Sequence, residues 1–403
     1  MNLTTNLLRS SLENDAAFRR RRRLQPIEGP GAKIFPPTYP GQKRDEPQHV
    51  FERRRIDGQD VWCVLVDSVQ SQTNRLEEFL LEAVRQKAIE LPYVSVDFSE
   101  AHLGGLTEIT SLEAPHRLFD AILRDSELNS TPFMKSENGK ALIAAKSSDA
   151  SAIFELSPTA LLFGVWNSTG EGGGLGAKFP RCLVSELIGV NVPVEDDNGE
   201  ITSAGRRTGS RIDPLGVLKG VEVFKSKEGW EVDKNKAGKG ATKAKPSEIN
   251  HGNIKPTVQS LGITCDYIEQ TSVVTLAGLR RLRFGSGDRT PAARALLAAL
   301  GLLALLEQDV RGFALRSRCD LVCDGAAPLE LLRFDGSSQP IDLDLNTARA
   351  VYSECVAAAR KAGFAFSSEP LKLKPQAKLV QIVQKSRELA LAGEGGEAAE
   401  TAG

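Results

Sequence analysis

Residues 170–176 form a loop that is unusually dense in glycine and is followed by two cations. Five of these seven positions are glycine, with Gly173 and Gly174 at the centre, and Lys178 and Arg181 come shortly after the loop. Glycine has no Cβ, so a ligand can approach the backbone N–H groups of such a loop closely. The pattern predicts contact with a phosphate-rich polyanion, and a purely structural glycine-rich turn is the alternative.

Two nucleotide-binding motifs resemble this loop but do not fit it. Residues 172–177 match the loose G-x-G-x-x-A fingerprint of dinucleotide-binding folds, which requires a helix immediately afterwards. Pro180 stands where that helix should run. A P-loop requires Gly-Lys-Ser/Thr, whereas Lys178 lies between Ala177 and Phe179. We therefore expect no nucleotide cofactor, and no other motif indicates a cofactor.

A second candidate site is the start of a helix that follows a short buried strand. Residues 61–66 have the apolar, β-branched character of a strand, and Asp67 or Ser68 is a suitable cap for a helix. The polar face of that amphipathic helix begins with Gln70, Ser71, Asn74 and Arg75. Free N–H groups, a hydroxyl, amides and a guanidinium can together hold a phosphate. The alternative is an ordinary solvent-facing side of the helix.

Three further basic segments could contact the same polyanion. Residues 19–23 are five consecutive arginines, which are typical either of a flexible, solvated arm or of an RNA-contacting arm. Lys33 shares a Pro/Gly-rich stretch with Phe35 and Tyr39, and single-stranded nucleic acid uses such cations and rings, although packing produces the same pattern. The third segment contributes Arg206, Arg207 and Arg211.

Histidine and cysteine give little indication of a catalytic or metal site. None of the four histidines has a histidine four positions away or a nearby cysteine cluster, so we expect no metal. RNA cleavage by acid–base chemistry would need a suitably placed histidine or acid–base pair, and His102 and His251 are the candidates. A lone histidine beside glycine is more often structural, so we expect a protein that is not an enzyme. The six cysteines have the spacing of reduced thiols.

The composition is that of a globular protein with strong local charge segregation. Hydrophobic residues make up 41% and charged residues 26% of the 403 positions. The net charge of −1 conceals about +6 in residues 1–55, about +6 in residues 201–260 and about −5 in residues 94–130. The longest apolar run, residues 295–306, is too short for a bilayer and predicts a buried helix. Because residues 1–12 lack a signal-peptide pattern, we expect a cytoplasmic protein without a membrane partner.

Strands and helices interleave along the rest of the chain and must position these groups. Strands are expected at residues 159–166, 264–276, 315–322 and 329–334, and helices at residues 113–124, 291–308 and 346–362. The stretch between Asp196 and Pro256 lacks apolar periodicity, which indicates an insertion with a mobile segment at residues 234–245. These patterns predict an α+β or α/β fold.

Six blocks of the sequence resemble one known family, in the expected order. They are residues 29–40 (GPGAKIFPPTYP), 67–77 (DSVQSQTNRLE), 163–181 (FGVWNSTGEGGGLGAKFPR), 210–216 (SRIDPLG), 245–254 (KPSEINHGNI) and 275–284 (TLAGLRRLRF). With these blocks the chain resembles the backbone RAMP subunit of type I-G (formerly I-U) CRISPR surveillance complexes, the seventh-class Cascade subunit. The resemblance spans nearly the whole chain.

The resemblance implies an α+β fold, an RRM-like (ferredoxin-type) RAMP palm with large insertions. Residues 1–190 would hold the N-terminal part of the palm with a helical insertion near 92–150, residues 191–257 a basic thumb-like insertion, residues 258–375 the C-terminal part of the palm, and residues 376–403 a C-terminal helix and a disordered acidic tail. In related subunits a Ser-rich helix start followed by a basic residue lies on the RNA backbone, which here implies Ser71, Asn74 and Arg75.

The resemblance also implies a function and a set of partners. The chain would be a guide-RNA (crRNA)-binding subunit that polymerises along the RNA and presents it for pairing with target DNA in antiviral defence. Its partners would be the guide RNA, the target DNA strand through RNA pairing, further copies of itself, other Cascade subunits and the effector helicase-nuclease. The alternative is a RAMP-type endoribonuclease that processes guide-precursor RNA.

Overall fold

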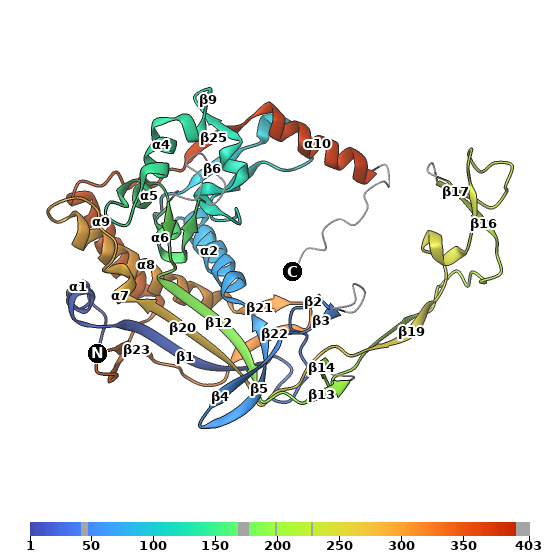
Figure 1. Cartoon of the computed structure of the whole chain (residues 1–403), viewed down its shortest axis with the longest axis horizontal. Helices are drawn as coiled ribbons and strands as arrows, with labels where there is room; N and C mark the ends of the chain where they lie inside the picture. The colour runs from blue at the N-terminus through green and yellow to red at the C-terminus, as the bar shows by residue number, and fades with distance from the viewer. Residues whose placement is uncertain (42–46, 168–176, 198–199, 227–228, 392–403) are drawn as a thin grey trace.

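Helices and a curled antiparallel sheet form the body of the protein in the computed structural model, and a long ribbon projects from it (Figure 1). The structure describes residues 1–41, 47–167, 177–197, 200–226 and 229–391. The predicted mixture of helix and sheet is confirmed. The expected acidic tail from residue 393 lies outside the described residues.

The main sheet contains nine strands. They are β1 (Ala17–Pro26), β4 (Phe51–Ile56), β5 (Gln59–Asp67), β12 (Leu183–Val190), β20 (Tyr267–Thr275), β21 (Phe313–Arg316), β22 (Cys319–Cys323), β23 (Leu329–Leu332) and β24 (Ser338–Ile341). Their order is β21-β22-β1-β20-β12-β5-β4, and β23, which carries β24, also pairs with β1. The sheet therefore brings together strands from both ends of the chain.

Four strands form the centre of the main sheet, and two helices connect them. In chain order these elements are β1, the helix α2 (Val69–Arg85), β12, β20, the helix α8 (Arg289–Arg311) and β22. Counted in that order, the four strands lie in the sequence fourth, first, third, second across the sheet. β20 pairs antiparallel with both neighbours, with Val274 opposite Phe18 of β1 and Ser272 opposite Ser185 of β12. Two strand–helix–strand units are thus interleaved, and the β4–β5 hairpin extends the sheet beyond β12.

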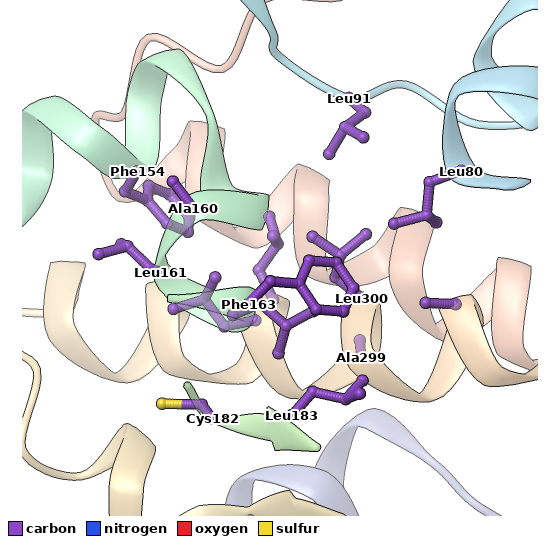
Figure 2. Close-up of a cluster of buried hydrophobic side chains, with 14 of the residues drawn as sticks. Leu80, Leu91, Phe154, Ala160, Leu161, Phe163, Cys182, Leu183, Ala299 and Leu300 are labelled. Carbon is purple, nitrogen blue, oxygen red and sulfur yellow. The ribbon is translucent and has the colours of Figure 1, made fainter. Parts of the chain in front are cut away.

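Helices cover one face of this sheet (Figure 1). They are α1 (Thr5–Asn14), α2, α7 (Leu276–Leu279), α8 and, packed on α8, α9 (Leu345–Lys361). α8 is long and apolar enough to cross a membrane, but 94% of that stretch is buried inside the protein. The buried helix predicted at residues 291–308 is confirmed, because α8 forms the centre of the core. Figure 2 shows Ala299 and Leu300 of α8 packed with Phe163 and Leu183.

A smaller five-stranded sheet lies beyond these helices. It consists of β6 (Val94–Asp97), β7 (Glu108–Thr110), β8 (Ser126–Leu128), β9 (Thr131–Pro132) and β25 (Leu371–Pro375). Around it lie α3 (Ala121–Arg124), α4 (Glu137–Ala144), α5 (Ser151–Leu156), α6 (Pro158–Phe163), α10 (Ala377–Leu391), and the 3-10 turns η1 (Ser99–Ala101), η2 (Arg117–Phe119) and η3 (Phe133–Lys135). Residues 92–150, expected to be helical, hold short strands as well as short helices.

The ribbon is inserted between β12 and β20, and we call residues 207–259 the arm. The hairpin of β13 (Val194–Asp197) and β14 (Glu200–Ser203) precedes the arm and lies at its base, and the shaft of the arm is β15 (Arg207–Arg211) paired with β19 (Ile254–Gln259). Its tip contains β16 (Val223–Ser226), β17 (Gly229–Glu231), β18 (Thr242–Ala244) and the turn η4 (Pro246–Ile249). The arm extends away from the body on one side (Figure 1).

The five arginines at residues 19–23 do not form an arm, because they lie in β1 at the centre of the main sheet. The side chains alternate between the two faces, as a strand requires. Arg20 and Arg22 point to the helix side, where both bind the carboxylate of Asp309. Arg19 and Arg21 point to the open face and pair with glutamates of β23 and β20.

Two predicted strands are wrong. Most of residues 159–166 belongs to α6, whose first residue is Pro158, and only Val165–Trp166 forms the strand β10, paired with β11 (Lys178–Phe179). α6 is buried all round, so it lacks the one-sided periodicity that separates helix from strand. Residues 315–322 contain a turn between β21 and β22 rather than one strand. The predicted helix at 113–124 is only η2 followed by α3, whereas α9, β20 and β23 agree with the predictions.

Candidate nucleic-acid interface

The first turn of α2 is fixed by a buried carboxylate. Ser68 caps the helix by accepting from the backbone N–H of Ser71. The preceding residue, Asp67, is fully buried and accepts from Arg75 at 3.1 Å and from Arg316 of β21 at 3.0 Å. Two guanidinium groups share one carboxylate, so this cluster keeps one net positive charge at the start of the helix.

One hairpin flanks α2 on the Arg75 side. Arg75 also donates to the carbonyl of Leu315 at 2.6 Å, which ties the helix to the β21–β22 hairpin (Figure 1). The turn of this hairpin contains Arg318, which has a left-handed backbone with φ of 58° and an exposed side chain. Its guanidinium carbon lies 4.4 Å from the ring centre of Phe35, and its carbonyl accepts from the Phe35 N–H. An exposed cation is thereby held on an aromatic ring.

Lys33 lies next to this pair at the base of the arm. Its ammonium donates to the carbonyl of Arg206 at 2.6 Å, and Arg206 pairs with Glu195 at 2.7 Å. The side chains of Lys33 and Phe35 pass within 3 Å of where a Cβ on Gly262 would be, so only glycine fits there. The structure therefore brings Lys33 and Arg206 together, as two of the predicted site residues.

A second hairpin flanks α2 on the Glu77 side. Glu77 is 2% exposed and binds Arg117 at 2.7 Å, and Arg117 also donates to the carbonyl of Gly164 at 3.0 Å. Gly164 leads into β10, so this pair anchors the β10–β11 hairpin to the helix. Burial raises the pKa of the Glu77 carboxyl to about 7, although Arg117 opposes the rise. Gly164 has φ of 85°, which favours glycine.

The exposed end of the β10–β11 hairpin also places a cation on an aromatic ring. Trp166 is directly opposite Lys178 across the two strands, and the Lys178 ammonium lies 4.8 Å from its ring centre. Trp166 is 52% exposed. Arg181 follows with an exposed side chain, and partial burial together with Arg117 lowers the pKa of its guanidinium. Arginine nevertheless remains charged at neutral pH.

The polar face of α2 lies between these two hairpins. Arg75 and Glu77 are two residues apart, which is about 200° around a helix, so the hairpins lie on opposite flanks. The helix face between them carries Gln70, Ser71, Asn74 and Glu78. Gln70 and Asn74 are exposed and Ser71 is half-buried. The arrangement is a strip of polar side chains with a cation and an aromatic ring on each flank, and it includes the Glu78 carboxylate.

The other predicted site residues lie apart from this strip or outside the described residues. Arg207 and Arg211 are exposed on β15, in the shaft of the arm. Gly173 and Gly174 lie outside the described part of the chain. Sequence reasoning missed Trp166 and Arg318. The sequence pattern predicts a buried strand at Trp166 and the middle of a strand at Arg318, where the structure has a hairpin turn.

The candidate histidines do not lie together. His102 is exposed and ends η1 in a left-handed conformation with φ of 52°. His251 lies in the arm, 5.7 Å from the ring centre of Trp230. His49 is buried at the base of the arm, where it accepts from the Gly262 N–H at 2.9 Å through Nε2. Its Nδ1 must then carry the proton and donate to the carbonyl of Pro37 at 3.1 Å.

Comparisons with known proteins bear on this part of the chain. Residues 18–194 match a family model described as CRISPR-associated protein GSU0053, and this span includes α2 and both strands of the β10–β11 hairpin. No curated protein matches the sequence significantly. Among solved structures, the chain is similar to Thermofilum pendens Csc2, with 10% sequence identity and a TM-score of 0.29, over 96% of this chain and 80% of that chain.

Proposed function

We propose that the chain is a guide-RNA-binding backbone subunit of a CRISPR Cascade complex, of the type I-G subtype, starting from the match of residues 18–194 to a CRISPR-associated family. The observation that carries the proposal is the strip along α2. There, the polar first turns of a helix lie between two cation-on-ring pairs, Lys178 on Trp166 and Arg318 on Phe35. Single-stranded nucleic acid binds to such combinations of positive charge and aromatic surface.

The proposed palm is RRM-like and of the ferredoxin type. Its support is the order of the four central strands, β22-β1-β20-β12, with α2 and α8 as the two connecting helices. This is the arrangement of a split β-α-β-β-α-β unit. The β4–β5 hairpin, the small sheet and the arm are then insertions into that unit.

In the proposed mechanism the protein contacts phosphates and leaves the bases free. Lys33, Lys178, Arg181 and Arg318 form no ion pair within the described part of the chain, so their charges are available to a polyanion. Phosphate contacts fix the position of an RNA strand and carry no sequence information. A guide held in this way keeps its base edges exposed for pairing with a target DNA strand.

The proposed role contains no chemical step, and its partners are those of an assembly subunit. They are the guide RNA, the target DNA strand through RNA pairing, further copies of the chain, other Cascade subunits and the effector helicase-nuclease. The proposed location is the cytoplasm. RNA cleavage by acid–base chemistry would require a histidine or an acid–base pair near the bound phosphate, and the two candidate histidines, His102 and His251, lie on separate parts of the described fold, at η1 and in the arm.

One experiment tests binding and cleavage together. Purified protein is mixed with labelled, repeat-containing guide RNA, and both retention on a filter and the length of the RNA are measured over time. We expect retention of intact RNA. Absence of retention at low salt would contradict the binding role, and specific cleavage that is lost in His102→Ala or His251→Ala would favour the endoribonuclease.

A further inference from the structure

A pocket of about 340 Å³ lies between the small sheet, α4 and the start of α10. Its apolar lining includes Phe119 of η2, Met134 of η3 and Ile143 of α4. This volume is at the small end of the roughly 300–1,000 Å³ typical of small-molecule sites. The pocket can therefore hold one small molecule or one residue-sized unit of a polymer, and not a longer segment.

The rim of the pocket is positively charged. Arg124, Lys135 and Lys378 line it together with a single carboxylate, that of Asp125, so its formal net charge is +2. Asp125 accepts from Lys378 at 2.6 Å, which fixes that ammonium at the edge. Lys135 is exposed and forms no ion pair within the described part of the chain. The pocket thus combines an apolar wall with cations that attract an anionic group.

Two amides complete the lining. Gln376 is held by its backbone N–H, which donates to the carbonyl of Asp125 at 3.0 Å, and by its Nε2, which donates to the carbonyl of Ser126 at 3.3 Å. Asn167 is 93% buried and directly follows Trp166 of the β10–β11 hairpin. The pocket consequently adjoins the candidate nucleic-acid interface through two consecutive residues. Side-chain amides are the groups that hydrogen-bond base edges.

We propose that this pocket binds a single nucleotide, with the base against the apolar wall and the phosphate at Lys135 and Lys378. An aromatic and thioether wall offers a face for a flat base, cations suit a phosphate, and amides suit base edges. The ligand class is a nucleoside monophosphate unit. Its source, a nucleotide of the bound guide RNA, rests on the proposed function, whereas the binding of a free nucleotide does not.

The test uses the full, RNA-free chain and titrates it with the four nucleoside 5′-monophosphates, with ribose 5-phosphate and with inorganic phosphate, by calorimetry. We expect a nucleoside monophosphate to bind at least tenfold more tightly than ribose 5-phosphate, because only the former fills the apolar wall. Ile143→Trp should abolish this binding by filling the pocket, and Lys135→Ala should weaken it severalfold. Lys140→Ala, at an exposed lysine of α4 outside the pocket lining, is the matched control and should leave binding unchanged.

Three results would overturn the proposal. They are the absence of binding by every mononucleotide, equal binding of ribose 5-phosphate and the nucleotides, and nucleotide binding that survives both Ile143→Trp and Lys135→Ala. If Ile143→Trp does not fold, the comparison of Lys135→Ala with Lys140→Ala decides whether the nucleotide binds in this pocket. Binding of a long RNA without binding of any mononucleotide would contradict the pocket proposal alone. Binding of a mononucleotide without binding of a long RNA would contradict the guide-RNA role alone. Competition between a short oligoribonucleotide and the mononucleotide would identify the RNA as the source, and its absence would identify a free nucleotide.

Discussion

Cations at the candidate interface are of two kinds, and the difference decides what each can do. Arg75 is bound to the buried carboxylate of Asp67 and to a backbone carbonyl, so two of its five N–H donors are used inside the protein and its charge is partly neutralised. Lys178 and Arg318 instead lie on aromatic rings, which fix their position without neutralising their charge. We therefore expect Arg75 to position α2 and add charge to it, and the two exposed cations to bind phosphates.

Removal of either exposed cation should weaken RNA binding without changing sequence preference. For Lys178→Ala and Arg318→Ala we expect a similar loss on two unrelated RNAs, and a decrease of about 0.7 in the slope of log K against log salt for each. Filter-binding titrations at several salt concentrations measure both quantities. Lys361→Ala, at the exposed end of α9, is the control. Unchanged affinity in both variants, with folding intact by circular dichroism, would remove the strip along α2 from the RNA path.

His49 should make stability depend on pH. Burial lowers the pKa of its imidazole, so the folded protein resists protonation that the unfolded chain accepts below about 6.5. The contribution of His49 to stability is therefore complete above that pH and is lost as the pH falls through it. Urea unfolding at pH 7.5 and 5.5 should show a smaller loss in His49→Gln than in the unsubstituted protein.

A control and the opposing group complete this prediction. Glu77, whose pKa is raised to about 7, lowers stability as the pH rises towards that value, but it is the same in both proteins and cancels in the comparison. His102→Gln, at an exposed histidine, should behave as the unsubstituted protein. Identical pH dependence in His49→Gln would mean that folding does not lower the pKa of His49.

At the scale of elements, α2 could be predicted because its signals are local. The strand before it, the Ser68 cap and the change of period all lie within twenty residues, and all are confirmed. β1 could not, because five consecutive arginines carry no apolar alternation. The partners that turn them into a central strand, Asp309, Glu269 and Glu330, are remote in sequence. The β21–β22 hairpin was missed because Ser317 and Arg318 lack the glycine or asparagine that usually marks such a turn.

The arginines of β1 depend on Asp309 of α8. Arg20 and Arg22 are 6% and 5% exposed, and both bind this one carboxylate. Asp309→Ala would leave two buried guanidinium groups without their counter-charge, and we expect a loss of about 3 kcal/mol in the free energy of unfolding. Denaturant unfolding measures it, with Asp324→Ala, at an exposed position, as the control. A loss no greater than that of the control would show that β1 does not need the pair.

At the scale of the whole molecule, the arm is the feature that the body alone does not explain. Ile212, Leu215 and Leu218 are 82%, 71% and 75% exposed, and the shaft is a two-stranded ribbon. Such a ribbon is only marginally stable in water, and clustered exposed apolar side chains mark contacts with other macromolecules. Together with the segregated charges, this favours a head-to-tail contact between copies, which does not close on itself.

The assembly should therefore grow with the RNA. In light scattering we expect particle mass to rise with RNA length, and Leu215→Ser combined with Leu218→Ser to reduce this growth while leaving the affinity for a short RNA unchanged. Ile382→Ser, at an exposed apolar residue of α10 away from the arm, is the control. A monomer or a fixed dimer at every RNA length would contradict open assembly.

The central claim, that the chain binds a guide RNA, is tested most directly by the RNA that accompanies the purified protein. The measurement is the ratio of absorbance at 260 and 280 nm before and after ribonuclease treatment, followed by sequencing of the extracted RNA. The account predicts a ratio that falls on treatment, and sequences that begin or end in CRISPR repeats. The protein is co-expressed with a CRISPR array for this measurement. Purification without RNA, or with RNA of random cellular origin, would contradict the claim.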